Sequence, residues 1–200
     1  MNLEDYQTVF AVGSFALMLV AASPTLALVL TLPSGESFSE LWLLGPGHAA
    51  DNYPFNIRGG EEQRLFVGVG NHLGFSAYYA IHVKLRNQSQ PLPDTNNSLA
   101  SSLPTLYEFR LVVPNGKNWE APVDFKVSEV SVDSNVTVVR RVTINNETFH
   151  IHGVSKWDSE HHGFYYQLFF ELWLYNTSLR SFEFHNRFVG IRLNVTLSHS

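Results

Sequence analysis

Cysteine is absent from all 200 residues of the sequence. A secreted eukaryotic domain of this size usually carries disulfides, so an extracellular protein without cysteine is more typical of an archaeal surface than of an animal one. Without cysteine, the Cys-Trp-Cys arrangement that stabilises antibody domains cannot form, which excludes an antibody-type domain.

Charged residues are scarce as well, at 16% of the sequence, whereas aromatic residues make up 14%. This composition argues against a disordered chain and favours a packed domain. The net charge is −5, and the Lys and Arg residues are scattered rather than gathered in a basic stripe. We therefore do not expect nucleic acid to be a partner.

The motifs of common enzyme families are missing too. The sequence has no G-x-S-x-G, no H-E-x-x-H and no phosphate-binding loop motif, and its carboxylates are not paired in sequence. We predict neither an enzymatic activity nor a cofactor.

What the sequence does contain is a set of six Asn-x-Ser/Thr sequons, the acceptor pattern for N-linked glycans. They are Asn87, Asn96, Asn135, Asn146, Asn176 and Asn194. With 15 Asn and 29 Ser plus Thr in 200 residues, chance would give only about two. Five sequons fall at predicted turns or loops, and the sixth, Asn194, lies on the polar face of a predicted strand. This distribution predicts a glycosylated domain outside the cell.

Residues 9–32 form a run without a charged residue. At about 1.5 Å per helical residue, this run is long enough to cross a bilayer. We predict that residues 1–33 are a membrane anchor with one transmembrane helix, kinked at Ser23-Pro24, and that residues 34–200 form an extracellular domain. The alternative is a signal peptide cleaved before Ser23, although the run is longer than the apolar region of such a peptide and lacks a basic start.

After residue 33, short apolar runs alternate with turn signals and predict strands. The expected strands are residues 38–44, 64–70, 78–86, 107–113, 123–132, 136–144, 148–154, 164–175 and 189–196. A phase change near Ser128 predicts a β-bulge, Asn145-Asn146 predicts a tight hairpin, and residues 87–104 predict a long mobile or functional loop. The predicted fold is all-β, an antiparallel β-sandwich with immunoglobulin-like topology.

Four histidines are candidate metal ligands. His150 and His152 share one face of a predicted strand, and His161-His162 follow after one turn. Such a cluster could bind Zn²⁺ or Cu²⁺, and a metal-dependent enzyme is the corresponding alternative. Because no acidic residue or cysteine stands at ligand spacing, we prefer a polar outer face without a metal.

The predicted strand at residues 164–175 is apolar on both faces. The face directed away from the core carries Phe169, Trp173 and Tyr175. Either a loop or another sheet covers these residues, or they form an interface with another subunit or a glycan. If they are covered, the loops at residues 48–60 and 87–104 are the remaining candidate binding surfaces.

Two short motifs carry a family resemblance. The first is Leu44-Gly45-Pro46-Gly47 followed by Ala49 or Ala50, Asp51, Tyr53 and Pro54, and the second is the V-G-V-x-N-H run at residues 67–72. They resemble the extracellular part of an archaeal membrane-protein family known as domain of unknown function 1616, over residues 26–194. The resemblance implies a membrane region next to an extracellular domain. Members typically have several N-terminal membrane helices, whereas this chain has room for one, and no activity is established for the family, so it implies no catalytic residue.

These observations predict a membrane-anchored, N-glycosylated archaeal cell-surface protein with its C-terminal domain outside. It would act as a binding or structural module of the envelope, with the membrane, N-linked glycans, copies of itself or other envelope proteins as partners. The alternative is a subunit of an extracellular filament or surface layer, in which the N-terminal segment completes a neighbour's sheet by β-strand addition. An edge strand without a partner and a cleaved N-terminus would favour this alternative.

Overall fold

The computed structural model describes residues 6–7, 10–18 and 36–197. The chain divides into two units, Met1–Ser37 and Phe38–Ser200. In the first unit, residues 10–18 are helical. Across the described residues, no helix combines the length and the apolar character needed to cross a membrane. Most of the predicted membrane segment, including Ser23-Pro24, lies outside the described residues.

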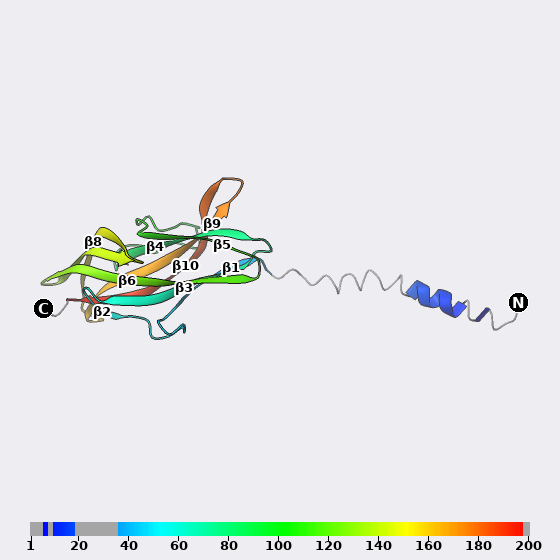
Figure 1. The fold of residues 1–200 in the computed structure, drawn as a ribbon, viewed down its shortest axis with the longest axis horizontal. Coiled ribbons are helices and arrows are strands. Elements are labelled where there is room, and N and C mark those ends of the chain that lie inside the picture. The colour runs from blue at the N-terminus through cyan, green and yellow to red at the C-terminus, as the bar shows by residue number, and fades with distance from the viewer. Residues whose placement is uncertain (1–5, 8–9, 19–35, 198–200) are drawn as a thin grey trace. The chain divides into compact units, whose positions relative to one another are not determined.

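The second unit consists of strands joined by turns and loops (Figure 1). The strands are β1 (Phe38–Leu44), β2 (Asn56–Arg58), β3 (Glu62–His72), β4 (Ala77–Asn87), β5 (Tyr107–Val113), β6 (Lys117–Asp133), β7 (Val136–Ile144), β8 (Glu147–Asp158), β9 (Gly163–Asn176) and β10 (Ser181–Thr196).

The strands form one sheet that curls back on itself. One half has the order β1-β3-β6-β7-β8, and the other has the order β5-β4-β9-β10-β2. Strand β8 belongs to both halves: most of it pairs with β7, and its last residues, Trp157 and Asp158, pair with β9. All neighbouring strands are antiparallel except β10 and β2. The predicted all-β fold is confirmed, and its strands are antiparallel as predicted apart from the β10–β2 pair. The immunoglobulin-like sandwich stays a prediction.

The two halves enclose one apolar core, because alternate residues of each central strand point inward. The innermost side chains are at most 2% exposed and come from both halves: Leu65, Val67, Val69, Phe125, Val142, Ile144, Tyr79, Ile81, Leu168, Phe170, Leu172 and Leu193. Burying each large apolar side chain of this kind contributes about 1.5–3 kcal/mol, so this core is the main source of stability.

Two predicted local features have clear counterparts. Asn145 and Asn146 have φ angles of 46° and 69°, and Ile144 pairs with Glu147. This is a two-residue hairpin turn with both central residues left-handed, as predicted. The irregularity predicted near Ser128 lies at the next residue, Glu129, whose φ is 53°.

The long connection between β4 and β5, residues 88–106, is anchored to the sheet. Lys84 Nζ donates a hydrogen bond to the carbonyl of Ser101 at 2.7 Å, and the Ser101 N–H donates to Glu171 Oε1 at 2.7 Å. Asp94 and Leu99 exchange two backbone hydrogen bonds within the same connection. The connection therefore covers part of the outer face of β4 and β9, which determines where a candidate site can lie.

Candidate functional site

Aromatic rings from β4, β9 and β10 contact one another on the outer face of the sheet. They lie toward the end of the domain where β9 and β10 project as a hairpin (Figure 1). The rings of Tyr78, Tyr175 and Phe182 lie 5.7, 5.0 and 5.3 Å apart. Trp173 lies beside them, 6.0 Å from Phe184. We call these five residues the aromatic surface, and each of them is partly exposed.

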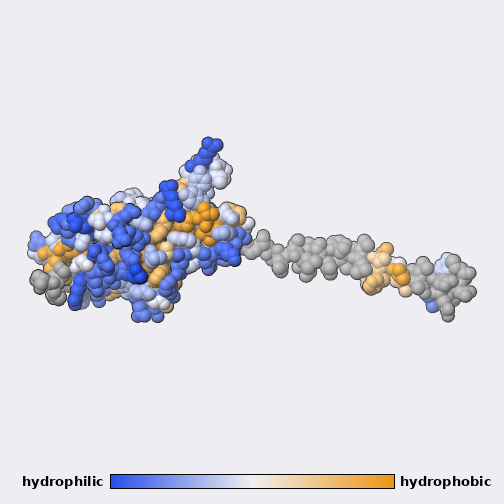
Figure 2. All heavy atoms as spheres, viewed as in Figure 1, coloured by the Kyte–Doolittle hydropathy of each residue, from blue (hydrophilic) through white to orange (hydrophobic). Residues whose placement is uncertain are grey.

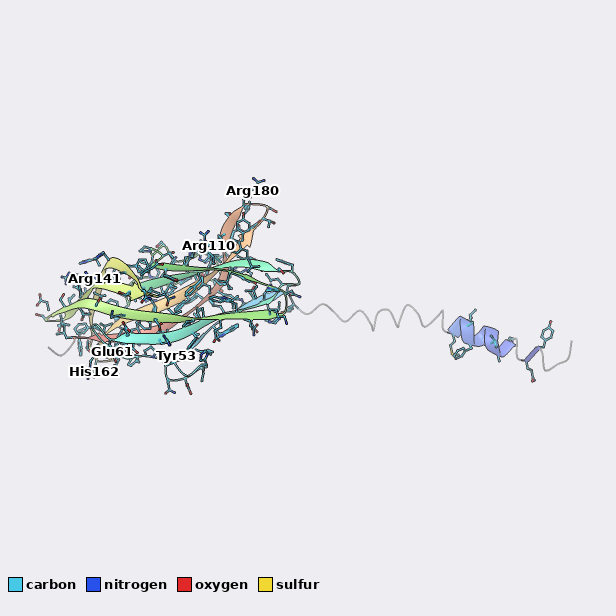
Figure 3. The ribbon with its side chains drawn as sticks, viewed as in Figure 1. Tyr53, Glu61, Arg110, Arg141, His162 and Arg180 are labelled. Atoms are coloured by element: carbon cyan, nitrogen blue, oxygen red, sulfur yellow. The ribbon has the colours of Figure 1, made fainter. Side chains whose placement is uncertain are left out.

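Charged and apolar groups border the aromatic surface. The guanidinium of Arg110 lies 5.5 Å from the centre of the Phe182 ring, a cation–π geometry. Val112 and Leu179 are each more than half exposed. Figure 2 shows hydrophobic residues at the base of the hairpin, and Figure 3 shows Arg110 near this base and Arg180 at the hairpin tip. An apolar centre with a charged border resembles the composition of protein interfaces.

Only part of the predicted interface belongs to this surface. Trp173 and Tyr175 do, and their role as an interface stays a prediction. Phe169 is fully buried, because it lies opposite Lys84 on β4 and Gly190 on β10, at the end of the face that residues 88–106 cover. Phe169 is therefore not available to a partner, which corrects the prediction for this residue.

A buried polar network separates the covered end from the aromatic surface. Lys84 Nζ and Glu171 Oε2 form an ion pair of 2.9 Å, with 4% and 0% of the side chains exposed. Trp173 Nε1 donates to the same carboxylate at 3.2 Å. Because a buried carboxylate needs several partners, these contacts and the N–H of Ser101 explain how Glu171 is tolerated inside the domain.

His82 and Glu108 extend this network toward the surface. His82 Nε2 lies 2.8 Å from Glu108 Oε2. Burial lowers the pKa of His82, and the hydrogen bond to Glu108 only partly opposes this effect. Burial also acts to raise the pKa of Glu108, but hydrogen bonds from Arg110 and His82 outweigh it and lower that pKa. The arrangement holds these charged groups in fixed positions between Glu171 and the surface.

The four candidate metal ligands lie at two places. His150 and His152 are exposed on β8, and His161 and His162 are exposed in the turn before β9. His161 Nδ1 instead lies 3.0 Å from Asp158 Oδ2. Among the residues that the structure describes, no group of three or more His, Cys, Asp or Glu side chains is arranged to hold a metal ion.

The six sequons fall into two groups. Asn96, Asn135 and Asn146 are exposed. The other three are partly buried, and each donates a hydrogen bond through Nδ2, the atom that would carry a glycan. The acceptors are the carbonyl of Val154 for Asn87 at 2.6 Å, Glu183 Oε2 for Asn176 at 2.7 Å, and Asn56 Oδ1 for Asn194 at 2.9 Å. A glycan is therefore accommodated most easily at the first three.

The first family motif forms a compact loop after β1. The N–H of Gly45 donates to the carbonyl of Ala49 at 2.7 Å, and a Cβ at Gly45 would overlap the carbonyl of Asp51. The Tyr53 hydroxyl closes the loop by donating to the carbonyl of Leu43 at 2.8 Å. The glycine and the tyrosine thus have structural reasons to be present.

The second motif is structural as well. Asn71 is fully buried, and its Nδ2 donates to the carbonyls of Phe75 and Val113 at 2.8 and 2.7 Å. Its Oδ1 accepts hydrogen bonds from the N–H of Leu73 and the hydroxyl of Tyr79. This side chain uses its donors and acceptors to hold two loops against the sheet, which gives the motif a structural role.

Sequence reasoning missed three members of the aromatic surface. Phe182 and Phe184 lie in the first part of β10, before the strand predicted at residues 189–196. Tyr78 starts a predicted strand but faces away from the core. The available signal was the run of alternating aromatic residues at Phe182 and Phe184, which continues the apolar outer face of β9.

Comparison with solved structures finds a distant likeness to a β-glucosidase from Listeria innocua. Its crystal structure is 12% identical over 82% of this chain, with a TM-score of 0.39. The complex of a Listeria innocua β-glucosidase with gluconolactone is 13% identical over 60% of this chain, with a TM-score of 0.33. This chain covers only 17% and 16% of those proteins, and likenesses this weak carry no argument about function.

No curated protein matches the sequence. The model of one family, described as a domain of unknown function (DUF1616), matches residues 32–139. The match spans more than half of the chain and contains both motifs whose loops are described above. The chain therefore belongs to the DUF1616 family.

Proposed function

We propose that this protein is a membrane-anchored, N-glycosylated archaeal cell-surface protein whose β domain binds another protein of the envelope or a second copy of itself. The observation that carries the proposal is the aromatic surface. Five partly exposed aromatic side chains contact one another beside a projecting hairpin, and contiguous apolar patches on a surface mark interaction sites.

The chemistry of the aromatic surface suits a protein partner. Tyr and Trp are enriched among the residues that dominate binding energy, as is Arg, which Arg110 supplies at the border. The β9–β10 pairing fixes Tyr175 opposite Phe182 and Trp173 opposite Phe184. These side chains are held before a partner arrives, which reduces the entropy that binding would cost.

The proposed location rests on the sequence and on the sequons. The charge-free run at residues 9–32 supports an anchor that precedes the β domain, and the three exposed sequons support a domain that faces outward. We retain the immunoglobulin-like arrangement as a proposal about the fold. The proposal includes no catalytic activity, no metal and no cofactor.

The test uses the full chain in detergent. A double substitution, Tyr175→Ala with Phe182→Ala, should weaken self-association or retention at the cell surface by about tenfold or more, because it removes a cross-strand aromatic pair. The matched control is Trp157→Ala, which removes another exposed aromatic ring, 41% accessible, from β8. Analytical ultracentrifugation and cell-surface fractionation measure the effect. Equal behaviour of the two variants, with both still folded, would contradict the proposal.

A filament or surface-layer subunit is the second candidate. The observation that favours it is that two strands lie at edges of the sheet. Among the described strands, β1 pairs only with β3, and β5 pairs only with β4. Such edges can accept a strand from another chain. The N-terminal residue of the native protein tests this candidate: a start near Ser23 would favour a processed subunit, whereas an uncleaved N-terminus and detergent-dependent release would favour the anchor.

A further inference from the structure

A groove opens between the two halves of the sheet, on a side away from the aromatic surface. It has a volume of about 570 Å³, which is in the range of small-molecule sites. Its walls come from the end of β4, the last part of the β4–β5 connection and the exposed edge of β8. The residues that line it include Leu85, Arg86, Gln90, Leu103, Thr105, Thr148, Phe149, His150 and His152.

Among the described residues that line the groove, Arg86 is the one with a permanent charge; Arg86 also lines the neighbouring pocket, together with Asp158. None of the residues that line it is acidic, although the whole chain has a net charge of −5. Arg86 donates to two neutral acceptors, the carbonyls of Asn87 and Gln88, at 2.8 and 2.9 Å. No described carboxylate forms an ion pair with it, and burial lowers the pKa of Arg86. A partly buried guanidinium without a counter-charge favours an anionic ligand.

The other lining residues alternate between apolar and hydrogen-bonding groups. Leu85, Leu103 and Phe149 offer apolar contacts, while Gln90, Thr105 and Thr148 offer amide and hydroxyl groups. A sugar ring has this combination of an apolar face and a polar edge, whereas a fatty acid needs a site that is apolar along its length. We propose that this groove binds an acidic oligosaccharide, with Arg86 holding a sugar carboxylate and with His150 and His152 donating hydrogen bonds.

In this groove the two β8 histidines have a role other than metal binding. Both are exposed and both line the groove, so their imidazole N–H groups can reach a ligand there. It also concerns a different surface from the proposed protein interface, so either one can fail without the other. Asn87 lies at the groove as well, and a glycan on that residue would compete for the space.

The experiment uses the full chain, produced without glycosylation and kept in detergent. Isothermal titration calorimetry measures binding of tri-galacturonate, of the neutral galactotriose and of tri-glutamate. We expect tri-galacturonate to bind about tenfold or more tightly than either control, since a charge-assisted hydrogen bond discriminates to that extent. Arg86→Gln and the double substitution His150→Ala with His152→Ala, which removes both imidazole donors, should each weaken its binding by about tenfold.

The matched control variant is Arg180→Gln, which removes an exposed arginine from the hairpin tip (Figure 3) and should leave binding unchanged. Arg86 also donates hydrogen bonds to the carbonyls of Asn87 and Gln88, so thermal unfolding should confirm that the Arg86 variant is folded. The histidine variant changes only exposed side chains, so it tests the groove even if the Arg86 variant does not fold. Equal binding of galactotriose would overturn the role of charge, and equal binding of tri-glutamate would overturn the role of the sugar. Absence of tri-galacturonate binding, or its retention in both groove variants, would overturn the proposal.

Discussion

The outer face of β9 has two ends with the same kind of sequence and opposite environments. At one end, Phe169 and Glu171 are fully buried; at the other, Trp173 and Tyr175 stay partly exposed. The difference comes from a distant segment, because Ser101 in the β4–β5 connection binds Lys84 and Glu171 and reaches no further along the strand. The same outer face of β9 is therefore buried at Phe169 and is a candidate interface at Trp173 and Tyr175.

The largest effect should come from deleting the aromatic ring at the covered end. Phe169→Ala should lower the free energy of unfolding by about 3–5 kcal/mol, because it leaves a cavity in a fully buried position. Trp173→Ala should cost less than about 2 kcal/mol, since part of that ring already contacts water. Urea unfolding of both variants measures the difference. Equal losses would remove the distinction between the two ends.

The next effect concerns the ion pair that marks the boundary between the ends. Lys84→Met should cost about 3 kcal/mol, because Glu171 would keep a buried charge without its cation. Combining it with Glu171→Leu should recover most of this loss. As a control, Arg64→Met breaks an exposed pair with Asp124 and should cost less than about 1 kcal/mol. A double variant as unstable as the single one would show that the pair is not the cause.

A smaller effect should follow from pH. In the folded domain burial lowers the pKa of His82, with Glu108, Lys84 and Glu171 as its charged neighbours. The unfolded chain, with a His pKa of about 6.5, then binds more protons than the folded one. Stability is therefore fully present above pH 6.5 or so, and it falls as the pH drops from there toward the folded pKa.

The measurement is urea unfolding at about pH 7.5 and about pH 5.5. One such histidine changes the free energy of unfolding by at most about 1.4 kcal/mol per pH unit. His185 acts in the same direction, because burial and the charge of Arg187 lower its pKa. We expect His82→Gln to reduce the pH dependence and His82→Gln with His185→Gln to reduce it further. An unchanged slope in the double variant would contradict the assigned cause.

The positions of most strands along the chain could be read from the sequence, because alternation is a local signal. The bounds of β1 and β5 agree with the prediction, and the Asn145-Asn146 turn follows from residues that tolerate left-handed angles. The start of β6 at Lys117 was missed because Pro122 lies inside the strand, where it pairs opposite Phe66, and proline argues against a strand interior. Strand β2 was missed because its three residues are too short to show a period.

The candidate site was only half predictable for a different reason. The pattern of β9 indicated an apolar outer face, but the segment that binds Glu171 on this face, through the N–H of Ser101, lies 70 positions earlier. Likewise, the pattern placed His150 and His152 on one face of a strand, but only the fold brings Arg86 to the same groove. Local periodicity assigns a residue to a face, whereas long-range packing decides what meets that face.

The smallest effect on stability should come from the exposed part of the connection that covers Phe169. Asn96 is exposed and its side chain can carry a glycan freely, so Asn96→Gln should remove one glycan and change the free energy of unfolding by less than about 0.5 kcal/mol. Asn194 differs, because its Oδ1 accepts from the N–H of Phe164 and its Nδ2 donates to Asn56. Asn194→Gln should therefore cost about 1–2 kcal/mol. Site-resolved mass spectrometry of the native protein should find glycans at Asn96 and not at Asn194; the reverse pattern would show that the hydrogen bonds of the folded domain do not decide which sequons are used.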